Sequence, residues 1–231
     1  MIISENEAIQ VVSAWRSLVN LYTSRNIPIT VFLDYFGGDN CFKITEENIR
    51  FWGEQLINEK EGERKIHIYA GIHNCKFYVY LIDSKNDRIR NFENTIFRKE
   101  LIYKDINKTI FGELDFEKAK TRINRWVNFK KDWLTAVQGE QMFRIIEIGY
   151  DDYVKLNLAE GESCLNFLAL EKPNPQGINE QIEVIAVKEH NGTHVAEDFS
   201  SPRPPFHVPL SHNNYQLLLL SDQPNNVDAF V

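Results

Sequence analysis

Residues 65–84 read KIHIYAGIHNCKFYVYLIDS, and this stretch decides the fold. It consists of two runs rich in β-branched and aromatic residues, Lys65–Ile72 and Lys76–Asp83, separated by a short segment around Asn74. Two such runs joined by a tight turn are typical of paired antiparallel strands. The stretch therefore predicts a β-hairpin.

The hairpin ends a succession of elements that occurs twice in the chain. Residues 4–84 predict a helix, a strand, a helix and two further strands, and residues 115–189 predict the same five elements in the same order. The second hairpin is expected from residues 163–170 and 182–189. A repeated order of this kind indicates an internal duplication, in which Trp126 is expected to take the place of Trp15.

Each copy predicts a small sheet covered by helices. In the first copy, Ser4 and Glu7 form a capping box before a helix whose apolar residues recur at spacings of three and four. Ile29–Phe36 predicts a buried strand, and Thr45 is expected to cap a second helix that crosses over to a parallel strand. Since the hairpin adds an antiparallel strand, the predicted fold class is α+β, with two similar helix-strand-helix-strand-strand units, each a small mixed sheet.

The same patterns divide the chain into four segments. These are a first α+β unit at residues 1–87, a connector at 88–114, a second α+β unit at 115–192 and a Pro/Asn-rich C-terminal tail at 193–231. The connector contains a further predicted strand at Thr95–Tyr103, and the tail contains one at Tyr215–Leu220.

The composition is that of a globular protein. Among 231 residues, 43% are hydrophobic, with 15 Phe, 9 Tyr and 4 Trp, which is enough apolar area for a large core. No apolar run reaches the length of a membrane helix, and the acidic start of the chain does not resemble a signal peptide. Three widely spaced cysteines, Cys41, Cys75 and Cys164, indicate free thiols. We therefore expect a cytoplasmic protein with no membrane partner.

Several of these segments together resemble a group of uncharacterised bacterial proteins of unknown function. The resemblance lies in the strand pair 65–71 and 77–83, the Trp-bearing helix 115–137, the His190-Asn191-Gly192 turn and the Pro-rich residues 198–205. It spans most of the chain and implies the same run of elements, with a Pro-Pro segment near the C-terminus. In that group cysteines flank the Pro-Pro segment, and this chain lacks them. The resemblance implies no activity, substrate or catalytic residue.

The charge is unevenly distributed, although the net charge is −7. Residues 85–131 carry 13 basic and 7 acidic side chains, whereas residues 138–231 carry 5 basic and 14 acidic ones. The basic residues of the helix 115–137 that lie mainly away from its apolar stripe are Lys118, Arg122, Arg125 and Lys131. They predict a partner-binding surface or, as an alternative, a nucleic-acid surface. The overall acidity and the lack of an RNA-binding motif argue against nucleic acid.

A second group of residues suggests a metal site. His190, His194, Glu197 and His207 lie close in sequence, and imidazole with carboxylate suits zinc, iron or nickel. The turn-forming sequence Asn191-Gly192 lies among them, so no regular element is expected to hold their geometry. The alternative is that these histidines are solvated residues of a loop.

No catalytic group emerges from the remaining residues. Cys75 lies two residues after His73, but a turn at Asn74 would direct the thiol and the imidazole apart. Gly37-Gly38 lacks the Lys-Ser/Thr of a phosphate-binding loop. We assign no catalytic residue and no cofactor. The sequence therefore favours a non-enzymatic interaction or scaffold protein whose partner is a protein, with a metal-dependent hydrolase and a nucleic-acid-binding protein as alternatives.

Overall fold

The structure, a computed structural model, describes residues 1–24, 27–106, 116–136, 143–170, 182–190, 193–198, 200–203 and 214–223. The helices are α1 (Glu5–Thr23), α2 (Ile29–Phe36), α3 (Glu46–Leu56), α4 (Ser84–Arg88), α5 (Phe116–Ala136), α6 (Tyr150–Lys155) and α7 (Gln216–Ser221). The strands are β1 (Ile2–Ile3), β2 (Cys41–Thr45), β3 (Lys65–His73), β4 (Lys76–Asp83), β5 (Ile96–Glu100), β6 (Ile145–Gly149), β7 (Ser163–Leu170), β8 (Ile182–His190), β9 (Thr193–Asp198) and β10 (Ser200–Arg203).

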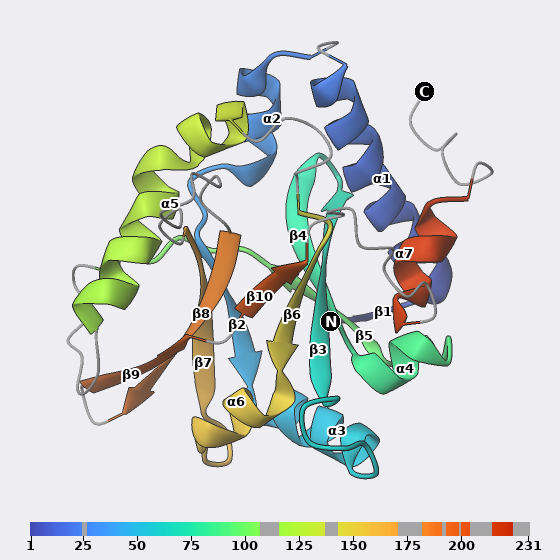
Figure 1. The fold of residues 1–231 in the computed structure, drawn as a ribbon, viewed down its shortest axis with the longest axis vertical. Helices are drawn as coiled ribbons and strands as arrows, with labels where there is room; N and C mark the ends of the chain where they lie inside the picture. Colours follow the sequence, from blue (N-terminus) through green and yellow to red (C-terminus); the bar gives the residue numbers. More distant parts are fainter. Residues whose placement is uncertain are drawn as a thin grey trace.

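Two antiparallel sheets lie between helices (Figure 1). Sheet A has the strand order β1-β5-β4-β3-β6-β10, and sheet B has the order β2-β7-β8-β9. Helix α1 packs on β3 of sheet A, and α5 packs on β7 of sheet B. The inner faces of the two sheets share one core cluster, to which Ile68 of β3 and Val184 of β8 both belong. The predicted α+β class is confirmed.

The strands of the two sequence copies are exchanged between the sheets. The first copy supplies β2 and the hairpin β3-β4, and the second supplies β6 and the hairpin β7-β8. In the structure β6 pairs with β3, and β2 pairs with β7. Each hairpin is therefore extended by the first strand of the other copy. The strand that follows each hairpin, β5 or β9, pairs with the hairpin's last strand.

The two tryptophans compared in the sequence occupy one aromatic cluster. Trp15 and Trp126 are both fully buried, and Phe36 of α2 lies between them, with ring centroids 5.7 Å from Trp15 and 5.6 Å from Trp126. The indole N–H of Trp15 donates to the Phe143 carbonyl at 3.0 Å, whereas that of Trp126 has no hydrogen-bond partner among the described residues. The two environments are thus related but not identical.

Three predictions of local structure are wrong. Ile29–Phe36 is the helix α2, because Phe32 and Phe36, four residues apart, are the side chains it buries and Gly37 ends it at φ +56°. Tyr215–Leu220 is not a strand, since Gln216–Ser221 forms α7. Every recorded strand pair is antiparallel, so the expected mixed sheets with parallel pairs do not form, and the units at 1–87 and 115–192 contribute strands to both sheets.

The hairpin of residues 65–83 is confirmed. Strand β3 pairs with β4 from Ile66 opposite Asp83 to His73 opposite Lys76. The two residues of the turn, Asn74 and Cys75, both have positive φ, at 48° and 57°. Positive φ at both central positions is the signature of a type I′ turn, whose twist matches that of the strands. None of the described helices is long and apolar enough to cross a membrane.

Candidate functional site

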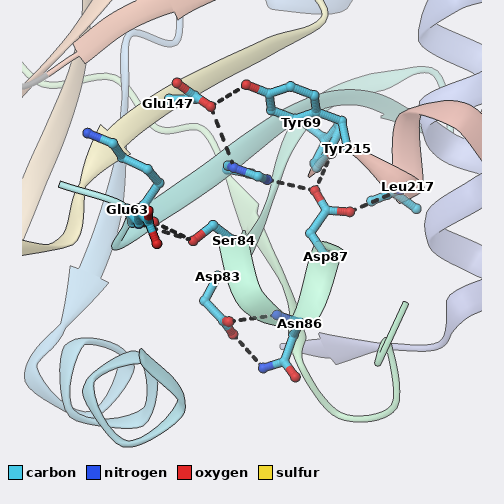
Figure 2. A network of polar contacts seen from close by, with 11 residues as sticks. Glu63, Tyr69, Asp83, Ser84, Asn86, Asp87, Glu147, Tyr215 and Leu217 are labelled. Carbon is cyan, nitrogen blue, oxygen red and sulfur yellow. Dashed lines mark hydrogen bonds and ion pairs between the residues drawn. The ribbon is translucent and has the colours of Figure 1, made fainter. Parts of the chain in front are cut away.

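A buried cluster of ionisable side chains lies on the outer face of sheet A (Figure 2). Its centre is His67, whose Nδ1 lies 2.6 Å from Asp87 Oδ2 and whose Nε2 lies 3.7 Å from Glu147 Oε1. Two tyrosines complete it, since Tyr69 donates its hydroxyl to Asp87 and Tyr215 donates its hydroxyl to Glu147. We call these five residues the His67 cluster.

Strand geometry places the first members of the cluster. His67 and Tyr69 are two residues apart on β3, so they share one face of the sheet. The register of β3 with β6 sets Glu147 directly opposite His67. The opposite face of β3 carries Ile66 and Ile68 into the shared core. A period-two alternation therefore separates the polar cluster from the apolar interior.

Helix α4 brings Asp87 to the imidazole. Asp83 caps this helix, because its Oδ1 accepts the backbone N–H of Asn86 at 2.9 Å. Burial raises the pKa of Asp83 above its usual range, while the hydrogen bonds from the backbone and side chain of Asn86 act in the opposite direction. The cap fixes the start of α4, and Asp87 follows on its first turn.

The cluster is closed to solvent. His67 is 2% exposed, Asp87 and Tyr69 are fully buried, and Glu147 and Tyr215 are 9% and 7% exposed. Burial raises the pKa of Tyr69 well above its usual value, and the neighbouring charge of Asp87 raises it further. The phenol therefore stays protonated and serves as a hydrogen-bond donor. Because buried carboxylates are costly unless they are paired, the imidazole and the hydroxyls stabilise this arrangement.

The cluster also holds the C-terminal helix of the described chain. The backbone N–H of Leu217, in the first turn of α7, donates to Asp87 Oδ1 at 3.0 Å. The rings of Tyr215 and His67 lie with centroids 4.9 Å apart. The geometry thus shows side chains of the kind used in acid–base chemistry, but their contacts join β3, β6, α4 and α7 to one another (Figure 2).

Three of the four predicted metal ligands lie on β8 and β9, at one edge of sheet B. His190 is the last residue of β8 and pairs with Thr193, while His194 of β9 pairs with Glu189 and Glu197 pairs with Ala186. His207 and the side chains of the other three lie outside the described residues. Within the part of the chain whose side chains are described, no group of three or more His, Cys, Asp or Glu residues is arranged to hold a metal ion. The metal site at residues 190–207 stays a prediction.

Helix α5 carries the predicted partner-binding residues. Lys118, Arg122 and Arg125 recur at helical spacing and fall on one stripe, which Phe129 continues, whereas Lys131 falls outside it. Lys118 and Lys131 are exposed, and Arg122 and Arg125 are partly exposed. Nη1 of Arg122 lies 3.2 Å from Oε2 of the buried Glu183 on β8. We call Lys118, Arg122, Arg125 and Phe129 the α5 stripe.

Part of the basic middle of the sequence is paired within the fold. Besides the Arg122–Glu183 pair, Arg88 lies 2.9 Å from Glu59, and Arg98 lies 2.9 Å from Glu7. Glu7 thus pairs with Arg98 instead of completing the capping box, although its backbone N–H donates to Ser4 Oγ at 3.2 Å as predicted. These ion pairs attach the basic segment to acidic residues of other elements.

The cysteines differ in environment. Cys41 and Cys164 are buried, and burial raises the pKa of each thiol to about 12. Cys75 is exposed in the hairpin turn. His73, two residues earlier, directs its Nδ1 to within 3.9 Å of Glu7. No group in contact with Cys75 marks it as a nucleophile among the interactions that the structure describes.

The His67 cluster was not predicted from the sequence. His67 and Tyr69 do alternate with isoleucines in KIHIYAG, which is a local signal for two polar residues sharing one face. Asp87 and Glu147 come from a helix end and from a strand in the other half of the chain, so their approach depends on tertiary structure. The molecule is an α+β protein in which strands from both halves of the chain form two antiparallel sheets. Comparisons with protein-family models, with curated proteins and with solved structures find no match.

Proposed function

We propose that this protein is a non-enzymatic interaction protein of the cytoplasm, and that it binds a protein partner through the α5 stripe. The observation that carries the proposal is the exposure of Phe129, which is 51% accessible on a helix whose tryptophans, Trp126 and Trp133, are buried. Interfaces between proteins are enriched in aromatic residues and in arginine, and their strongest contacts centre on such residues. Phe129 and Arg125 provide this combination.

The charge of the stripe supports an acidic surface on the partner. Lys118 and Arg125 flank Arg122, whose charge is engaged with Glu183. A basic stripe with one apolar anchor selects a partner that presents carboxylates around an apolar recess, because complementary charge accelerates association and excludes basic surfaces. The sequence as a whole has a net charge of −7, which disfavours a nucleic acid in the same place.

The ionisable side chains of the His67 cluster bind one another inside the fold, which supports a role outside catalysis. The His67 cluster, in which five ionisable side chains meet, is buried and joins four elements. All three cysteines are free thiols, which agrees with a reducing compartment.

Site-specific photo-crosslinking in cells tests the proposal. A photoreactive p-benzoylphenylalanine in place of Phe129 is expected to crosslink to one protein, which mass spectrometry then identifies. Arg125→Glu in the same chain should reduce that crosslink at least tenfold, because it places a carboxylate against the partner's acidic surface.

The matched control places the same photoreactive residue at Val154, an exposed apolar position on α6 with 50% accessibility. The partner should not crosslink there. Equal crosslinking at both positions, or a crosslink at position 129 that survives Arg125→Glu unchanged, contradicts the proposal. Stoichiometric zinc or iron in untagged protein, lost in a His190→Ala/His194→Ala variant, would instead support the metal-dependent hydrolase.

A further inference from the structure

Helix α7 is held to the rest of the molecule at both of its ends. At its start, Tyr215 donates to Glu147 and the N–H of Leu217 donates to Asp87. At its end, Ser13 of α1 donates to the Ser221 carbonyl at 2.8 Å, and Asp222 pairs with Arg16 and Arg144. Between them, the side chains of Leu217, Leu218 and Leu220 are buried against the outer face of sheet A.

This helix cannot be stable by itself. It has six residues, and isolated helices shorter than about 12 residues are marginal in water even for favourable sequences. It takes part in no strand pairing and lies against α1 and α4 (Figure 1). Elements with these properties open locally at a lower free energy than the central strands of a sheet.

The His67 cluster connects the two contacts at the start of α7. Asp87 binds the helix amide and Glu147 binds the Tyr215 hydroxyl, while the imidazole of His67 lies against both carboxylates. When α7 leaves, each carboxylate loses a donor at the same time. The cost of leaving two carboxylates short of partners in a low-dielectric environment opposes that movement.

We propose that residues 214–223 form a latch that detaches from sheet A as a unit, and that Asp87 and Glu147, joined through His67, set how often it opens. The open state uncovers His67 and Glu147, together with Tyr69 and Ile145, which belong to the same core cluster as the leucines of α7. The latch is separate from the α5 stripe, because α5 packs on sheet B. It gives the molecule a second, normally covered surface.

Amide hydrogen exchange of the full chain, followed by mass spectrometry or NMR, tests the latch. In the wild type, the amides of Leu217, Leu219 and Asp222 should exchange at least tenfold faster than those of β3, which is paired on both sides. Asp87→Asn and Tyr215→Phe should each accelerate the α7 amides at least another tenfold, which corresponds to about 1.4 kcal/mol. The β3 amides should not change.

Tyr153→Phe is the matched control. Tyr153 is fully buried on α6 and donates to Asn166 Oδ1 at 2.8 Å, so this variant removes the same phenol hydroxyl at a place distant from α7. It should leave the exchange of residues 216–222 unchanged. Equal protection of α7 and β3 in the wild type overturns the latch, as does acceleration by Tyr215→Phe that affects β3 in parallel. Acceleration of α7 by Tyr153→Phe to the same extent overturns the role of the cluster.

Discussion

His67 illustrates how a single polar residue is accommodated in an otherwise apolar strand. Its imidazole is 2% exposed, and burial of that kind is tolerated only when polar atoms find partners. Asp87 of α4 and Glu147 of β6 provide these partners, and Tyr69 and Tyr215 donate their hydroxyls to the two carboxylates. These contacts hold elements of the fold together. The exposed Phe129 on α5 is better placed than His67 to bind another molecule.

The three thiols should differ sharply in reactivity. A disulfide reagent at pH 8 is expected to label Cys75 rapidly in the native protein and to label Cys41 and Cys164 only after denaturation, because burial keeps the latter two protonated and inaccessible. Cys75→Ser should abolish the rapid phase. Rapid labelling of more than one thiol in the native state contradicts the burial of the other two.

The raised pKa values of Cys41 and Cys164 determine how the free energy of unfolding changes with pH. The thiols of Cys41 and Cys164 have a folded-state pKa of about 12, against about 9 when unfolded. Above pH 9 the unfolded chain therefore releases protons that the folded chain retains, and the free energy of unfolding falls as the pH rises towards 12. The urea concentration at the unfolding midpoint should be lower at pH 10 than at pH 8. This difference should be smaller in the Cys41→Ala/Cys164→Ala variant.

The turn residue Cys75 offers a stabilising substitution. A left-handed conformation costs a non-glycine residue about 1–2 kcal/mol, and glycine recovers most of this at the expense of a more flexible unfolded chain. Since Cys75 has φ +57° and follows Asn74, Cys75→Gly creates the Asn-Gly pair that type I′ turns favour. We expect stability to rise by about 0.5–1 kcal/mol in urea denaturation. Cys75→Ser, which keeps the strain, should show no such rise.

Among the elements, those with local signals in the sequence were predicted correctly. Ser4 and Thr45 do cap α1 and α3, and the run of β-branched and aromatic residues in KFYVYLID does mark β4. The prediction of a strand at Ile29–Phe36 was wrong because β-branched and aromatic residues also occur in a short helix when residues four apart, here Phe32 and Phe36, pack into the core. Four consecutive leucines in α7 gave an apolar run that periodicity alone cannot assign to strand or helix, and leucine is a strong helix former.

The helical state of α2 has a test of its own. Thr30 is exposed on the first turn of this helix, where alanine has a higher helix propensity by up to about 0.7 kcal/mol. Thr30→Ala should therefore raise the urea midpoint slightly. In a strand the same substitution would lower stability, since threonine is favoured there. A clear decrease in the midpoint contradicts the helix.

For the whole molecule, the sequence predicts a repeated order of elements but not the pairing of strands between the two halves of the chain. The predicted order of elements depends on local patterns, whereas the pairing of β6 with β3 and of β2 with β7 joins segments far apart in the chain. Nothing in either hairpin specifies which first strand extends it. The His67 cluster shares this limit, because Glu147 reaches His67 only through the exchanged strand β6.

The exchange predicts how the chain behaves when it is cut. A protease site inserted between Lys108 and Thr109 separates a fragment with β1–β5 from one with β6–β10. Sheet A contains strands of both fragments, sheet B does as well, and the aromatic contact of Phe36 with Trp126 crosses the cut. The cleaved fragments should therefore co-elute in size-exclusion chromatography in native buffer and separate only in denaturant. Two units with separate sheets would dissociate after cleavage. Separation of the fragments in native buffer would therefore show that the two halves of the chain do not share their sheets.

Phe36→Ala removes the ring between the two tryptophans, at a cost of about 3–5 kcal/mol. This variant should promote dissociation of the cleaved fragments, whereas Val154→Ala, at an exposed site, should not.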